Sequence, residues 1–116
     1  MTSFTVFLPI RTVSEANVRE HWGVVAKRAA AQRAESYYRL RNYRRAVVGK
    51  SVTIELVRIA PRKLDDDNLA RSFKAIRDGI ADAMGVRDND RRIRWAYDQR
   101  SDGVKTYGVE VNIRDA

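Results

Sequence analysis

The chain has 116 residues, of which 44% are hydrophobic and 33% are charged, and residues 1–116 are expected to form a single domain with its own core. It contains no cysteine and a single histidine, His21, which excludes disulfides, zinc–thiolate sites and thiol nucleophiles and argues against Ser-His-Asp catalysis. No apolar run approaches the roughly 20 residues that span a bilayer, and the N-terminus lacks a signal-peptide pattern, so we expect a cytoplasmic protein with no membrane contact.

The N-terminal half is expected to form a strand, a long helix and a second strand. Residues 4–8 are mostly β-branched or aromatic and precede a proline, which predicts a short strand. Residues 14–46 have helical composition, with a break expected near Ser36 or Asn42. Residues 51–59 alternate between apolar and polar side chains, which predicts another strand. The expected apolar stripe of the long helix consists of Val18, Trp22, Val25 and Ala29.

The C-terminal half is expected to form one helix and two strands. Residues 68–84 carry apolar side chains at helical spacing and precede Gly85, a favourable C-terminal cap. Strands are predicted over residues 92–97 and 107–113, joined by a hairpin turn at Gly103. Together these elements predict an α+β fold in which two or more helices pack on a mixed sheet of about four strands. The apolar stripe of the second helix consists of Leu69, Phe73, Ile76, Ile80 and Met84.

Positive charge is concentrated in the first part of the chain. Residues 1–64 contain 13 Lys and Arg against 4 Asp and Glu, a net charge of +9, whereas residues 65–116 contain 10 against 11, a net charge of −1. Such a surface would attract a polyanion through counterion release; the alternative is an ordinary solvated helix face. Much of the positive charge lies in residues 27–50, called the basic arc. Besides several residues expected to bind DNA, the arc contains Arg39, Lys50, Tyr37, Tyr38 and Tyr43. The residues expected to bind DNA are Lys27, Arg28, Arg33, Arg41, Arg44, Arg45, Arg62 and Lys63.

Three consecutive aspartates, Asp65, Asp66 and Asp67, stand out in a protein whose formal net charge is +8. Adjacent carboxylates repel one another unless a cation neutralises them, and a hard divalent ion prefers oxygen ligands. One aspartate would be enough to cap the following helix, so capping alone does not account for all three. We therefore expect Asp65, Asp67 and Asp90, the last of them in the acidic turn at residues 88–90, to form a Mg²⁺ site.

Charged residues also follow one face of the second predicted helix. Asp67, Arg71, Lys74 and Asp78 recur at spacings that span about 60° of arc. A cation at Arg71 or Lys74 would lie beside the expected metal ion and could stabilise the charge that develops on a phosphate during hydrolysis. The simpler interpretation is an exposed Lys74–Asp78 pair, which contributes about 0.3–0.5 kcal/mol.

Residues 64–95 carry a pattern that resembles the RusA family of Holliday-junction resolvases, which is common in phages and prophages. The likeness extends over residues 52–113, and its parts are Asp65-Asp66-Asp67-Asn68, Lys74-Ala75-Ile76-Arg77-Asp78 and Asp88-Asn89-Asp90-Arg91-Arg92-Ile93. The resemblance implies a homodimeric, Mg²⁺-dependent endonuclease of DNA recombination and repair. Such an enzyme nicks two opposing strands of a four-way junction and leaves 5′-phosphate and 3′-hydroxyl ends. It also implies that Asp65, Asp67 and Asp90 bind the metal and that Lys74 is the catalytic lysine.

Two alternatives stay open from the sequence. Arg71 lies one helical turn after the acidic run, where the family pattern places its lysine, while the four-residue spacing to Asp78 favours Lys74. The function is either that of a junction-resolving endonuclease or that of a non-catalytic DNA-binding protein whose acidic loop is a helix cap or a degenerate site.

Overall fold

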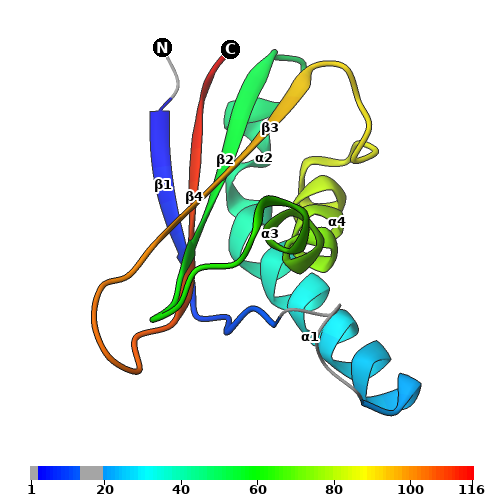
Figure 1. The fold of residues 1–116 in the computed structure, drawn as a ribbon. Helices are drawn as coiled ribbons and strands as arrows, with labels where there is room; N and C mark the ends of the chain where they lie inside the picture. Colours follow the sequence, from blue (N-terminus) through cyan, green and yellow to red (C-terminus); the bar gives the residue numbers. More distant parts are fainter. Residues whose placement is uncertain (1–2, 14–19) are drawn as a thin grey trace.

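Four strands form one mixed sheet in the computed structural model, which describes residues 3–13 and 20–116 (Figure 1). The strands are β1 (Ser3–Leu8), β2 (Val52–Ile59), β3 (Ile93–Arg100) and β4 (Gly108–Asp115), in the spatial order β1-β4-β2-β3. β4 pairs antiparallel with both β1 and β2, whereas β2 and β3 are parallel. Because helices pack on this mixed sheet, the expected α+β fold is confirmed.

The hairpin expected around Gly103 is not present, because β2 lies between β3 and β4. β2 takes this central place because it is the most buried strand, with Val52, Ile54 and Leu56 fully buried. A parallel pair such as β2 and β3 requires a long crossover connection, which residues 60–92 supply through two helices. The loop from β3 to β4 therefore passes the end of β2 (Figure 1).

The second predicted helix is in fact two helices, α3 (Asp66–Ser72) and α4 (Lys74–Met84). At the break, the hydroxyl of Ser72 donates to the carbonyl of Leu69, and the backbone N–H of Phe73 donates to the carbonyl three residues back. This tighter turn ends α3 immediately before α4 begins. Gly85 caps α4 with a left-handed φ of 71°, as the sequence predicted.

The basic arc lies on most of α1 (Trp22–Leu40), on a 3₁₀ turn η1 (Arg41–Tyr43) and on a short helix α2 (Arg44–Val47). The 3₁₀ turn confirms the break expected near Asn42. α1 begins after His21, whose Nδ1 accepts a hydrogen bond from the backbone N–H of Gly23. The helix start expected at Ser14 lies outside the described residues. In the described part of the chain, no helix has the length and apolar character required to cross a membrane.

The buried face of α1 differs from the apolar stripe expected from the sequence. Trp22 is 77% exposed, and Val18 lies outside the described residues. The buried residues of the helix are Gln32, Ser36 and Leu40. α1 packs tightly on α4, because a Cβ added to Gly79 would collide with the backbone of α1. The packing of α1 on α4 therefore depends on close backbone approach at Gly79, while Trp22 of the expected stripe stays exposed.

One apolar core lies between the helices and one face of the sheet (Figure 1). Phe73, at the break between α3 and α4, is fully buried, and its ring stacks on Tyr97 of β3 with centroids 5.5 Å apart. This contact fixes the start of α4 against the edge strand β3. The core consists of Leu8, Ile10, Leu40, Val47, Val52, Ile54, Leu56, Leu69, Phe73, Ile76, Ile80, Ala83, Met84, Val109, Val111 and Ile113.

Candidate active site

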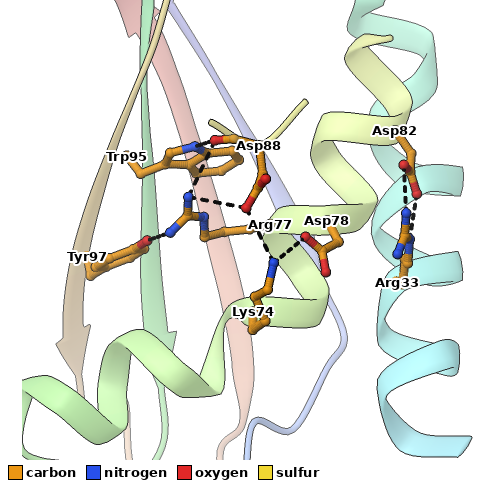
Figure 2. Close-up of polar contacts among 8 residues, drawn as sticks. All are labelled: Arg33, Lys74, Arg77, Asp78, Asp82, Asp88, Trp95 and Tyr97. Atoms are coloured by element: carbon orange, nitrogen blue, oxygen red, sulfur yellow. Dashed lines mark hydrogen bonds and ion pairs between the residues drawn. The ribbon is translucent and has the colours of Figure 1, made fainter. Parts of the chain in front are cut away.

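Lys74, the first residue of α4, lies between two carboxylates (Figure 2). Its Nζ is 2.9 Å from Oδ1 of Asp78, one turn further along the helix, and 3.4 Å from Oδ2 of Asp88, in the turn that leads to β3. The side chain of Lys74 is 65% exposed, whereas those of Asp78 and Asp88 are 23% and 32% exposed. The ammonium group is therefore held in place while it stays accessible to a ligand.

The two carboxylates also favour the protonated form of Lys74. The hydrogen bond to Asp78 is the main cause that raises the pKa of Lys74 above its ordinary value; desolvation opposes this effect and Asp88 adds to it. Lys74 is consequently a cation throughout the neutral pH range. It can donate hydrogen bonds to a phosphate, but it is not a general base.

Arg77, in the first turn of α4, ties Asp88 to β3 (Figure 2). Its Nη1 donates to the hydroxyl of Tyr97 at 2.6 Å, and its Nη2 donates to the carbonyl of Asp88 at 3.4 Å. The guanidinium carbon lies 4.8 Å from the ring centroid of Trp95, whose indole N–H also donates to the carbonyl of Asp88. Contacts with both α4 and β3 therefore place Asp88 beside Lys74.

Asp90, unlike Asp88, is bound to Arg92 rather than to Lys74. Its carboxylate accepts hydrogen bonds from Arg92, at 3.0 Å from Nε, 2.9 Å from Nη2 and 2.9 Å from the backbone N–H. The side-chain bonds, followed by the backbone bond, lower the pKa of Asp90 to about 2. The sequence pattern predicted a role for Asp90 and none for Asp88, because residue type alone does not separate two aspartates of one turn.

Replacing Asp90 with asparagine should remove part of the acid sensitivity of the fold. A carboxylate with a folded-state pKa of about 2 and an unfolded value of about 3.9 stabilises the protein above pH ~4 and loses that contribution as the pH falls toward 2. We expect the urea midpoint of the wild type to fall more steeply than that of Asp90→Asn between pH ~4 and ~2. Asp66→Asn removes an exposed carboxylate and serves as the control. An equally steep fall in Asp90→Asn would contradict the role of the Arg92 contact.

The three consecutive aspartates lie exposed at the start of α3. Asp65 is the N-cap, because its Oδ1 accepts a hydrogen bond from the backbone N–H of Asn68 at 2.9 Å. Its Oδ2 accepts a second one from the side-chain amide of Asn68 at 3.1 Å. Asp66 and Asp67 follow in the first turn of the helix. Capping therefore accounts for Asp65, and two further carboxylates remain on the surface.

The structure separates this acidic turn from Asp90. The backbone of Leu64 is bound to the side chain of Gln99, near the end of β3, by hydrogen bonds of 2.9 and 2.7 Å, whereas Asp90 precedes the first residue of that strand. Residues 93–99 extend about 20 Å along a strand. Within residues 3–13 and 20–116, no three His, Cys, Asp or Glu side chains form a group that could hold a metal ion. The structure thus does not bring Asp65, Asp67 and Asp90 together.

The donor chemistry of the acidic turn nevertheless fits Mg²⁺. This ion is usually bound through one or two carboxylates, keeps several waters and contacts substrate phosphates. Asp65 and Asp67 provide carboxylate oxygens on an exposed surface. The amide of Asn68 orients Asp65 in the way that outer partners orient metal ligands. If Mg²⁺ binds at this turn, Asp65 and Asp67 are the carboxylates that would hold it.

Two open pockets meet at Asp78, beside Lys74. The first has a volume of about 220 Å³ and is lined by Lys74 and Arg71 together with residues of α1. The second has a volume of about 310 Å³ and is lined by Asp88 together with Arg33 and Asp82. Arg71 is exposed and shares a pocket with Lys74, so both cations remain candidates for contact with a substrate.

The basic arc offers fewer free cations than its charge suggests. Lys27, Arg44 and Arg45 are exposed and form no ion pair with the residues that the structure describes. Arg41 stacks on the ring of Tyr38, with its guanidinium carbon 4.6 Å from the centroid. Other arginines of the arc are neutralised by the pairs Arg33–Asp82 (2.7 Å), Arg39–Glu35 (2.9 Å) and Arg28–Glu20 (2.8 Å).

No protein-family model matches this sequence. The chain is similar to an uncharacterized protein of Xylella fastidiosa (strain Temecula1), with 35% identity over 100 residues. The similarity covers 79% of this chain and 62% of that protein, so the chain spans less than two thirds of the length of this relative. A function for this chain is therefore inferred from the geometry of the site.

Proposed function

We propose that the protein is a Mg²⁺-dependent endodeoxyribonuclease that resolves four-way DNA junctions by paired, symmetric nicks, as the resemblance to RusA resolvases implies. The observation that supports the proposal most directly is the protonated Lys74, which lines an open pocket and is held there by Asp78 and Asp88. A fixed and accessible cation is suited to stabilise the charge that develops on a phosphate.

Each residue has a distinct proposed role. Asp65 and Asp67 would hold the Mg²⁺ ion, which when bound supplies an activated water and neutralises phosphate charge. Lys74 donates hydrogen bonds to a non-bridging phosphate oxygen. Asp78 and Asp88 are positioning residues that orient the ammonium group of Lys74. Arg71 remains the second candidate for the catalytic cation.

Labelled four-way junctions incubated with the protein in Mg²⁺ or in EDTA test this proposal. We expect paired nicks in Mg²⁺, no nicks in EDTA, and little cleavage of a linear duplex of the same sequence. Asp67→Asn should abolish cleavage, while Asp66→Asn removes the same charge from the neighbouring position and should retain it. Binding without cleavage by the wild type would favour the alternative, a non-catalytic DNA-binding protein.

Asparagine variants of the two acidic turn residues separate their roles. Asp88 contacts Lys74 and Asp90 contacts Arg92, so Asp88→Asn should slow junction cleavage much more than Asp90→Asn. Cleavage rates at saturating DNA measure the difference. The opposite order would return Asp90 to the metal site that the sequence predicted.

A symmetric junction requires two active sites, so we propose a two-fold symmetric homodimer. Light scattering after gel filtration should give twice the 13.3 kDa mass of one chain. A complex of one chain with one junction that still makes paired nicks would contradict the dimer.

We propose that Lys27, Arg44 and Arg45, which form no ion pair with the described residues, contact DNA phosphates. Replacing both Arg44 and Arg45 with glutamine should weaken junction binding and reduce the slope of log affinity against log salt by up to about 1.8, because each lost phosphate contact contributes about 0.9. Arg33→Gln is the matched control, since Asp82 already neutralises Arg33. An unchanged salt slope in the Arg44/Arg45 variant would remove these residues from the DNA surface.

A further inference from the structure

A third pocket, of about 250 Å³, lies where β2 ends and β4 begins. It shares no residue with the cluster around Lys74. Three of its lining residues are arginines and none is acidic. The lining consists of Arg11, Thr12, Val13, Arg58, Ala60, Pro61, Arg62 and Tyr107.

Arg58 is the innermost cation of this pocket and is only 8% exposed. Its Nε donates to the hydroxyl of Thr12 at 2.8 Å, and its Nη1 donates to the carbonyl of Arg62 at 2.6 Å. Both partners are neutral acceptors, and no carboxylate of the described residues pairs with this guanidinium. Burial accordingly lowers the pKa of Arg58. A buried charge without a counterion costs stability, so this position favours an anion supplied from outside the chain.

Arg11 and Arg62 add two exposed cations at the rim. The guanidinium carbon of Arg11 lies 4.1 Å from the ring centroid of Tyr107, which holds the side chain against the pocket wall. The hydrogen bond from Arg58 to the backbone of Arg62 fixes the loop that carries the third arginine. The three cations are therefore placed by contacts within the fold and gather around one opening.

We propose that the pocket of Arg11, Arg58 and Arg62 is a binding site for a phosphate group. Guanidinium groups recognise phosphate through paired, charge-assisted hydrogen bonds. A phosphate offers several acceptor oxygens and up to two negative charges, which suits three arginines better than a single carboxylate does. Residues 60–65 connect this pocket to Asp65, so a phosphate bound here would lie one short loop from the acidic turn. The site is independent of whether the Lys74 cluster cleaves DNA.

Calorimetric titration with inorganic phosphate tests the proposal, with sodium chloride at matched ionic strength as the reference. We expect one phosphate per chain for the wild type. The double variant Arg11→Gln/Arg62→Gln should bind at least about tenfold more weakly, because it loses two charge-assisted contacts. Arg94→Gln removes the same kind of charge from an exposed position on β3 and should bind as the wild type does. Equal affinity of the double variant and the wild type, or no binding beyond chloride, would overturn the proposal.

Thermal unfolding provides a second measurement centred on Arg58. Phosphate at about ten times its Kd should raise the Tm of the wild type by about 5 °C. Arg58→Gln should lose this increase, and because it removes the buried charge, it should not lower the Tm measured without phosphate. A phosphate-induced increase of the same size in Arg58→Gln would contradict the site; if that variant does not fold, the exposed double variant decides.

Competition identifies the source of the phosphate. A short single-stranded oligonucleotide without terminal phosphates is added to the phosphate titration. Displacement of phosphate would assign the pocket to the DNA backbone. Phosphate binding that the oligonucleotide leaves unchanged would assign the pocket to a small phosphorylated molecule. Both results support a phosphate site, and the Arg11/Arg62 variant checks that the competition occurs there.

Discussion

Replacing Lys74 with methionine is expected to lower the rate of Mg²⁺-dependent junction cleavage by roughly 10²–10³-fold, the usual effect of removing one group that stabilises transition-state charge. Asp78 and Asp88 hold the Nζ of Lys74 at 2.9 and 3.4 Å and keep it protonated. Their negative charges also favour a single position for the ammonium group. Single-turnover cleavage at saturating junction concentration measures the chemical step separately from binding.

Two further variants show whether the loss of junction cleavage is specific to Lys74. Lys105→Asn removes one positive charge from the exposed loop between β3 and β4, at a position with φ of 55° that asparagine tolerates, and it should cleave at the wild-type rate. Arg71→Met tests the other cation of the same pocket. A hundredfold loss in Arg71→Met together with near-normal cleavage by Lys74→Met would reverse the assignment of the catalytic cation.

Replacing Phe73 with alanine is expected to destabilise the fold by about 3–5 kcal/mol, the usual cost of emptying a fully buried phenylalanine site. Phe73 is completely buried and stacks on Tyr97, which in turn accepts a hydrogen bond from Arg77. The variant therefore also loosens the contact that places Asp88 beside Lys74. Urea unfolding at neutral pH measures the free energy of unfolding. The slope of this free energy against urea concentration should stay unchanged if unfolding remains two-state.

Phe7 provides the matched control for this truncation. It lies on β1, and its side chain is 50% exposed, so Phe7→Ala should cost about 1 kcal/mol, as typical for a less buried position. Equal losses in the two variants would contradict the expected contribution of the buried Phe73 to the stability of the core.

The sequence predicted the four strands and the main helical segments, although not the break between α3 and α4. Local signals were sufficient for this, because β-branched runs, helical spacing and terminal glycines act within a few residues of one another. The stripe of Ile76, Ile80 and Met84 is buried as expected, and Gly85 ends α4 in a left-handed conformation. The exposed acidic turn and the nearby Lys74 were likewise evident from residue type and spacing.

Only the tertiary structure decided which of these residues meet. Asp88 rather than Asp90 contacts Lys74, because Arg77 and Trp95 hold the carbonyl of Asp88. Such contacts join residues 7 and 11 positions apart across two elements, and no local pattern encodes them.

The same limit applies to strand pairing and to Arg58. The expected hairpin between β3 and β4 is absent because β2 lies between them and pairs in parallel with β3. The central place of β2 depends on burial summed over the whole sheet. The pattern of β2 does not indicate that Arg58 is buried. It also does not indicate that the guanidinium donates to neutral acceptors rather than to a carboxylate of the described residues. Local chemistry therefore determined the elements and the candidate residue types, whereas long-range packing decided which charges are paired, which are exposed and which are buried alone.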